Sequence, residues 1–74
     1  MREELKANIA KNINQCIVNS KRSASDVEFY FRKNDSKITA ETVRGWMKYG
    51  NLSAANLKIF ADMFNLSVNA FYER

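Results

Sequence analysis

Apolar residues recur at helical spacing through most of the chain. The first stripe repeats every four residues and consists of Leu5, Ile9, Ile13 and Ile17. It predicts a helix over residues 3–19. Val27 and Phe31 repeat the spacing in a second segment that runs to about residue 33, and residues 32–37 form a polar stretch without periodicity, as in a loop. The absence of proline and the presence of only two glycines favour helices joined by short turns.

Serine and threonine residues mark the expected starts of the helices. Ser25 and Glu28 have the spacing of a capping box at the start of the second helix. Thr39, Ser53 and Ser67 are three further candidate N-caps. Each lies in a hydrophobic staple, an apolar pair that flanks the cap: Ile38 with Val43, Leu52 with Leu57, and Leu66 with Phe71.

The three staples predict helices over residues 40–48, 54–64 and 68–73, and Gly50 fits a left-handed residue that ends the first of them. We therefore expect one all-α domain over residues 1–74, built from five short helices. The aromatic residues have helical spacing, so we expect a role in the core rather than base stacking. Phe29 is the exception, because Val27, Tyr30 and Phe31 already supply the inward face of its helix. Cys16 lies beside the first stripe, where we expect a small buried hydrophobic side chain.

Composition excludes several classes of function. The chain has no histidine and one cysteine, which excludes a His/Cys zinc site, a histidine-dependent catalytic triad and a disulfide framework. We expect neither an enzyme nor a bound metal or cofactor. No apolar run is long enough to span a bilayer, and the charged first 15 residues do not resemble a signal peptide, so we expect a cytoplasmic protein without a membrane partner. The net charge of +4 favours an anionic partner weakly, and also suits plain solubility.

Two segments resemble a known family. Residues 37–46 are similar to the turn and recognition helix of the phage-repressor/Cro-like helix-turn-helix domains, the XRE family. The positions that match there are Ile38, Thr39, Val43, Trp46 and Gly50. The tail is similar to the closing helix pair of the family, through Ala61, Phe64, Leu66, Ser67 and Phe71. The resemblance implies a lambda-repressor-like fold and a phage or bacterial transcriptional regulator, which would act as a repressor. It also implies sequence-specific binding to double-stranded DNA, as a homodimer on a palindromic operator.

The chain departs from the family pattern between its second and third helices. Glu28 stands where the family has a small alanine, Lys37 replaces the usual turn glycine, and about five extra residues, 32–36, separate the two helices. We therefore expect a lengthened connection at this point.

The resemblance also assigns candidate DNA contacts. If Val43, Trp46 and Met47 face inward, the other side of helix 40–48 is free to read bases. The candidate base-reading residues are Thr39, Ala40, Glu41, Thr42, Arg44 and Lys48. Arg44 is the strongest, because a guanidinium matches guanine O6 and N7, whereas Glu41 is repelled by phosphates unless it accepts from cytosine N4. The alternative for all six is an ordinary solvated helix face.

Other polar residues are candidates for phosphate contacts at helix starts and in loops. They are Ser23, Ser25, Arg32, Lys33, Lys37, Tyr49, Asn51 and Ser53. The alternative for about half of them is a purely solubilising role. Phe71 and Tyr72 are candidates for a dimer contact. A second function stays open, namely a protein-interaction module on the same scaffold, such as an antitoxin, an inhibitor or a subunit that docks onto a regulator. Glu41 on the reading face and the modest charge favour it.

Overall fold

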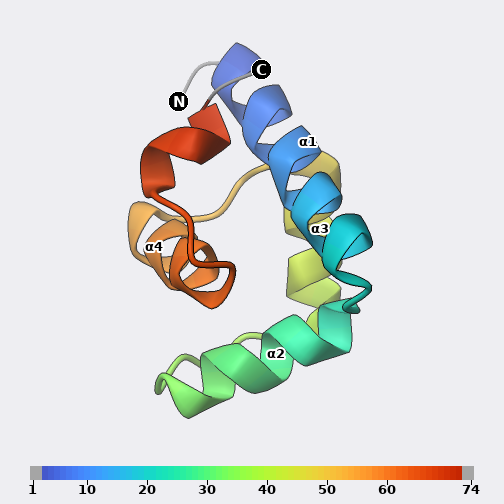
Figure 1. Ribbon diagram of the computed structural model, residues 1–74, viewed down its shortest axis with the longest axis vertical. Coiled ribbons are helices and arrows are strands. Elements are labelled where there is room, and N and C mark those ends of the chain that lie inside the picture. Colours follow the sequence, from blue (N-terminus) through green and yellow to red (C-terminus); the bar gives the residue numbers. More distant parts are fainter. Residues whose placement is uncertain (1–2, 73–74) are drawn as a thin grey trace.

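The computed structural model describes residues 3–72, and helices account for all of their regular secondary structure (Figure 1). There are four α-helices and one 3₁₀ helix in this part of the chain: α1 (Glu3–Ser20), α2 (Ala24–Lys33), α3 (Ala40–Tyr49), α4 (Ala54–Met63) and η1 (Val68–Tyr72). The expected all-α class is confirmed for these residues. The predicted fifth helix is present only as the 3₁₀ segment η1, and residue 73 of its predicted span lies outside the described residues.

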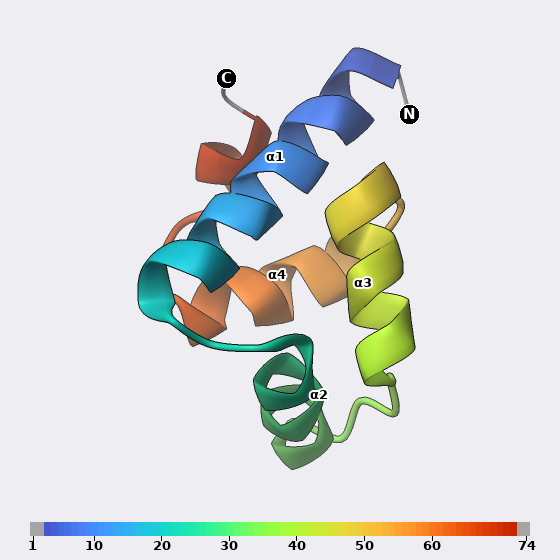
Figure 2. The same cartoon turned by 90° about the vertical axis from the view of Figure 1, so that its right-hand side faces the viewer.

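The core forms between α1 and the elements that pack against it. The stripe on α1 is confirmed, because Ile9, Ile13 and Ile17 are buried. Helix α1 contacts α3 and η1, while α2 contacts α3 and α4 (Figures 1 and 2). Aromatic rings fill the centre: the ring centres of Phe31 and Trp46 lie 5.3 Å apart, and those of Phe60 and Phe71 lie 5.6 Å apart edge to face.

The burial of the last aromatic pair corrects one prediction. Phe71 is only 1% exposed, so its side chain belongs to the core of this chain and is not available for a dimer contact. Its neighbour Tyr72 is half-buried and packs against the same core. The prediction was wrong because the helical pattern gave the spacing of Phe71 but not which of the two side chains meets α4.

Hydroxyl caps start three of the four α-helices. Thr39 accepts a hydrogen bond from the backbone N–H of Thr42, and Ser53 accepts one from Asn56, so two of the three predicted caps are confirmed. The third, Ser67, precedes η1, and its hydroxyl forms no hydrogen bond with the described residues. The predicted capping box at Ser25 and Glu28 is wrong, because Ser23 and Asp26 form it instead. This earlier start places Ala24 in the core and leaves Glu28 free for another contact.

Left-handed residues end all four α-helices. Gly50 has φ +64° and ends α3 as predicted. Lys21, Asp35 and Asn65 have φ near +59° after α1, α2 and α4. In each of these three cases, the N–H of the next residue bonds a carbonyl in the last helical turn, five residues back, which is the Schellman arrangement. The connection 34–39 between α2 and α3 thus begins with Asp35 in the left-handed region, and Lys37 is not in that region.

Asparagines on α1 bind backbone carbonyls at the ends of other elements. The Asn14 amide donates to the carbonyl of Met47 in the last turns of α3. The Asn12 amide donates to the carbonyl of Phe71 at 3.0 Å, and Asn8 donates to that of Tyr72 at 3.4 Å. The final carbonyls of a helix lack intrahelical partners, so these bonds satisfy groups that would otherwise need water. They also tie α3 and η1 to the same helix.

Leu66, which was predicted to form the third hydrophobic staple with Phe71, is more exposed than the apolar residues of the other two staples. Leu52 and Leu57 are buried, and Ile38 is half-buried against the core. Leu66 is 43% exposed, so it lies outside the core that Phe71 joins. Across residues 3–72, none of the helices combines the length and apolar character that a membrane crossing needs.

Candidate nucleic-acid interface

Helix α3 has one buried face and one exposed face. Val43 and Trp46 are at most 3% exposed, and Met47 is half-buried against the core. Four of the candidate base-reading residues are exposed on the opposite side: Glu41, Thr42, Arg44 and Lys48. Figure 2 shows α3 along the right-hand edge of the molecule, with the connection 34–39 entering from below and no described helix on its outer side. The predicted division between inward and outward residues is confirmed for these residues. The prediction was wrong for Ala40, which was expected to face outward but is half-buried and packs against the core at the start of α3.

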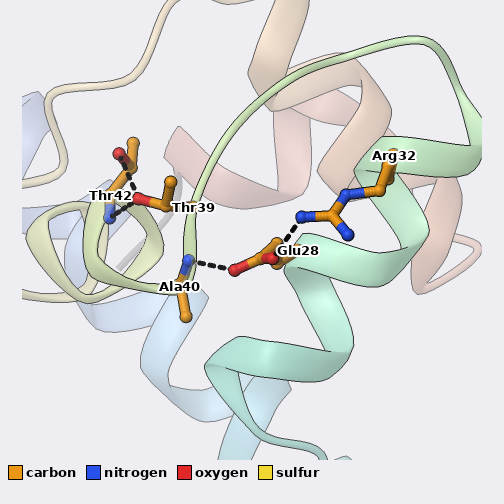
Figure 3. A network of polar contacts seen from close by, with 5 residues as sticks. All are labelled: Glu28, Arg32, Thr39, Ala40 and Thr42. Carbon is orange, nitrogen blue, oxygen red and sulfur yellow. Dashed lines mark hydrogen bonds and ion pairs between the residues drawn. The ribbon is translucent and has the colours of Figure 1, made fainter.

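The two threonines at the start of α3 are engaged with each other. The Thr39 hydroxyl accepts the Thr42 N–H at 3.2 Å, and the two hydroxyl oxygens lie 3.1 Å apart (Figure 3). The Thr39 oxygen therefore acts as the helix cap. Both side chains remain exposed, so the Thr42 methyl and hydroxyl groups are accessible from outside.

Arg44 and Lys48 lie one helical turn apart on the outward face of α3. No described residue forms a hydrogen bond or an ion pair with Arg44, so its guanidinium keeps all of its donors for solvent or a ligand. The Lys48 ammonium lies 5.3 Å from the centre of the Tyr49 ring. Between them, a Cβ atom at Gly45 would have no heavy atom within 4 Å outside its own turn. The backbone of α3 is thus open to close approach at this position.

Glu28 makes a contact that the sequence reasoning missed. One carboxylate oxygen accepts the Ala40 backbone N–H at 2.7 Å, and the other accepts from the Arg32 guanidinium at 2.7 Å (Figure 3). Glu28 therefore caps α3 from outside rather than capping its own helix. The sequence did mark this position, because Glu28 stands where the XRE family, which the chain resembles, has a small residue. The glutamate was instead predicted to cap its own helix α2.

The same contact places negative charge at the N-terminus of α3. The helix dipole makes this end partially positive and favours a carboxylate there. Ala40 is half-buried, and its N–H is occupied by Glu28, so this donor is not free for a phosphate. Glu41 adds a second exposed carboxylate in the first turn. Positive charge follows at Arg44 and Lys48, so the outward face runs from acidic to basic along the helix.

The candidate phosphate contacts separate into two groups. Ser23 and Ser53 cap their own helices, and Arg32 pairs with Glu28. The Lys33 ammonium lies 4.8 Å from the centre of the Phe29 ring, and the Tyr49 ring lies 5.3 Å from the Lys48 ammonium. These side chains already have partners within the chain. The exposed residues without such a role are Ser25, within the first turn of α2, Lys37 in the connection, and Asn51 before α4.

One group of candidates gathers at the C-terminal end of α3. Tyr49, Asn51 and Lys48 line a shallow hollow of about 340 Å³ together with Lys6, Ala7 and the acidic Glu3 of α1. The Tyr49 side chain is 56% exposed there. The sequence reasoning did not select Lys6, because α1 and α3 are distant in the chain and only their packing brings this ammonium near Lys48.

Among residues 3–72, no group of three or more histidine, cysteine or carboxylate side chains is arranged to hold a metal ion. Cys16 is half-buried rather than fully buried as expected, and burial raises the pKa of its thiol.

Comparisons with protein-family models, with curated proteins and with solved structures found no match to this chain.

Proposed function

We propose that the chain is a helix-turn-helix domain that binds double-stranded DNA with the outward face of α3 in the major groove. In this proposal α2 and α3 are the two helices of the motif, and residues 34–39 form a lengthened turn. The observation that carries the proposal is the exposed polar face of α3, on which Arg44 has no partner among the described residues.

The chemistry of this face suits the edges of base pairs. An α-helix fits the major groove of B-DNA, and an arginine can bond guanine O6 and N7 together. Gly45 adds no side chain beside Arg44, so the helix can approach the groove floor closely. Because Ala40 and Thr39 are engaged in capping, sequence reading falls mainly on Arg44, Lys48 and Thr42.

Phosphate binding would follow from the group of residues beyond the reading face. Lys6, Lys48, Tyr49 and Asn51 offer donors around one hollow, and Lys37 lies exposed before α3. If about four phosphates were neutralised per subunit, the logarithm of the binding constant would fall with log salt at a slope near −3.6. The proposed partner is a palindromic operator bound by a homodimer, with half-sites about 34 Å apart. Blocked access of polymerase would then make the protein a repressor.

The experiment is a selection from random duplexes, followed by titration of the selected duplex and by sedimentation of the complex. Arg44→Glu should weaken binding to the selected site by about tenfold to a hundredfold, because a bidentate arginine–guanine pair contributes about 1–3 kcal/mol. Lys58→Glu is the matched control, since it makes the same charge change on the exposed side of α4. A chain that binds selected and random DNA equally, at every salt concentration, would contradict the proposal.

A protein-interaction module is the second candidate. The acidic end of α3, with Glu28 and Glu41, is unfavourable for phosphates, and Phe29 on α2 is 60% exposed. On this reading Arg44→Glu would leave partner binding unchanged, and no salt-sensitive preference for a DNA sequence would exist. The same Arg44 variant therefore separates the two functions.

A further inference from the structure

We propose that Glu28 is the positioning residue of the recognition helix, because it fixes where the N-terminus of α3 lies on α2. This role rests on the proposed function, since it concerns how the side chain of Arg44 approaches a base pair. Glu28 itself need not touch DNA. Its effect would pass through the backbone of α3.

The connection before α3 leaves a need for such a residue. Helix-turn-helix motifs usually join their helices through three or four residues, which restricts the angle between them. Here residues 34–39 intervene, and the backbone hydrogen bonds that continue from α2 end at Ser36. Beyond that point only Ile38, which is half-buried, holds the connection against the core. The chain alone therefore restricts the orientation of α3 less than a short turn would.

Two contacts between α2 and α3 supply the restriction. Phe31 packs on Trp46 in the second half of α3, with 5.3 Å between ring centres. Glu28, one turn earlier on α2, accepts the N–H of Ala40 at the first residue of α3. One contact alone would allow α3 to tilt about it. Two contacts six residues apart define the direction of the helix axis, at a separation of about 9 Å.

The Glu28 carboxylate is itself held in place. Its second oxygen accepts from Arg32, four residues later on α2, and the glutamate side chain is 26% exposed. Both oxygens thus have partners, which restricts the side chain to one orientation. Hydrogen bonds between a charged acceptor and a backbone donor are also stronger than neutral ones. The pair therefore forms a bracket from α2 to the start of α3.

Arg44 depends on this bracket because it lies one turn after Ala40. A base-reading side chain has to be placed within about 0.5 Å and 10–20° of its productive geometry. A tilt of the first turn of α3 would move Arg44 away from that geometry, while leaving its charge in the same region. Loss of Glu28 should therefore reduce discrimination between sequences more than it reduces non-specific affinity.

The test compares Glu28→Ala, Glu28→Gln and Arg32→Ala with Ile59→Ala as the matched control. Ile59 packs against the core from α4 and forms part of neither the Glu28–Ala40 nor the Phe31–Trp46 contact, so its variant reports general destabilisation. Two quantities are measured: amide hydrogen exchange at Ala40, and the ratio of affinities for the selected duplex and a scrambled one. Glutamine keeps an acceptor oxygen, so Glu28→Gln should stay within about threefold of the wild type in both. Arg32→Ala leaves the bond to Ala40 but removes the partner of the second carboxylate oxygen, so its effects should lie between those of Glu28→Gln and Glu28→Ala.

Glu28→Ala should speed exchange at Ala40 and lower the affinity ratio, each by about tenfold, as expected for a lost hydrogen bond to a charged group. Ile59→Ala should lower the melting temperature and leave the affinity ratio unchanged. Unchanged exchange at Ala40 in Glu28→Ala, or an unchanged affinity ratio, would overturn the positioning role alone. If Glu28→Ala does not fold, a fall of the affinity ratio in Glu28→Gln as large as that in Arg44→Glu would overturn it, because glutamine preserves the acceptor. A wild-type chain without sequence preference would overturn the proposed function as well.

Discussion

Gly50 lies so close to Lys6 that a Cβ atom on Gly50 would fall 2.0 Å from the Lys6 carbonyl oxygen. The backbone of α1 therefore passes directly against the end of α3. The same residue has φ +64°, which side chains other than that of glycine rarely adopt. Conformation and space both require glycine at this position, and the two reasons are independent.

Gly50→Ala should destabilise the domain by more than about 2 kcal/mol, because the left-handed conformation costs an L-residue about 1–2 kcal/mol and the clash with Lys6 is added to it. Gly45→Ala is the matched control. It lies in the middle of α3, meets no atom within 4 Å, and should stabilise the domain by up to about 1 kcal/mol. Thermal unfolding of both variants checks this. Equal melting temperatures would mean that α1 and α3 separate at little cost.

Three further helix ends can be improved with glycine. Lys21 has φ +59° and is exposed, so Lys21→Gly should raise stability by about 0.5–1 kcal/mol. Asp35→Gly and Asn65→Gly should gain less, because aspartate and asparagine tolerate this conformation better.

Denaturant unfolding measures these changes, with Lys11→Gly as the control. Lys11 is exposed in the middle of α1, where glycine should cost about 1 kcal/mol. If glycine changed the free energy of unfolding in the same direction at Lys11 and at Lys21, the left-handed conformation of Lys21 would be contradicted.

The local part of the fold is well predicted from the sequence. The stripe on α1, the caps at Thr39 and Ser53 and the helix end at Gly50 depend on residues within one or two turns of each other. Residue type alone carries these signals, because caps and left-handed ends have strong preferences. The same holds for the buried and exposed faces of α3, which follow from helical spacing.

The parts that were missed depend on packing. Ser23 starts α2 because Ala24 then enters the core, and this is not evident from a motif that Ser25 and Glu28 also fit. The bond from Ala40 to Glu28 joins residues twelve positions apart. The left-handed conformation of Lys21 could not be predicted from residue type, because lysine has no preference for it. In the first two cases the decisive partner comes from another element, whereas the end of α1 is closed locally by the bond from the Arg22 N–H to the Ile17 carbonyl.

The contact between Asn14 and Met47 should contribute to stability. Asn14→Ala removes the donor that satisfies a carbonyl in the last turns of α3, and an unpaired group of this kind costs about 1–3 kcal/mol. Gln15→Ala, at the next and exposed position, should change stability by less than about 0.5 kcal/mol. Thermal unfolding of the two variants provides the comparison. A loss as large in Gln15→Ala would contradict the role of the hydrogen bond, because alanine raises helix propensity at both positions.

Cys16 should make stability fall at alkaline pH. Burial raises the pKa of its thiol above the ordinary value of 9.0, so the folded chain keeps this proton after the unfolded chain has lost it. The unfolded state then binds fewer protons, and the free energy of unfolding decreases as pH rises from about 9 through the higher pKa of the folded state. The Cys16→Ala variant lacks this component.

The measurement is the difference in stability between wild type and Cys16→Ala as a function of pH. A difference that stays constant between pH 8 and the folded pKa would contradict the shift. As a second readout, the thiolate is the reactive form, so a disulfide reagent should label Cys16 more slowly at pH 8 than it labels the unfolded chain.

Helix α3 begins at a residue capped by Thr39 and ends at Gly50, and it is held from within by Val43 and Trp46. These four residues fix the ends of α3 and its packing on the core, and none of them lies on the outward face of the helix. The residues at positions 41, 44, 45 and 48 could therefore be substituted without changing the rest of the fold. A library of variants at those four positions would present new surfaces on a helix whose ends and core contacts are unchanged.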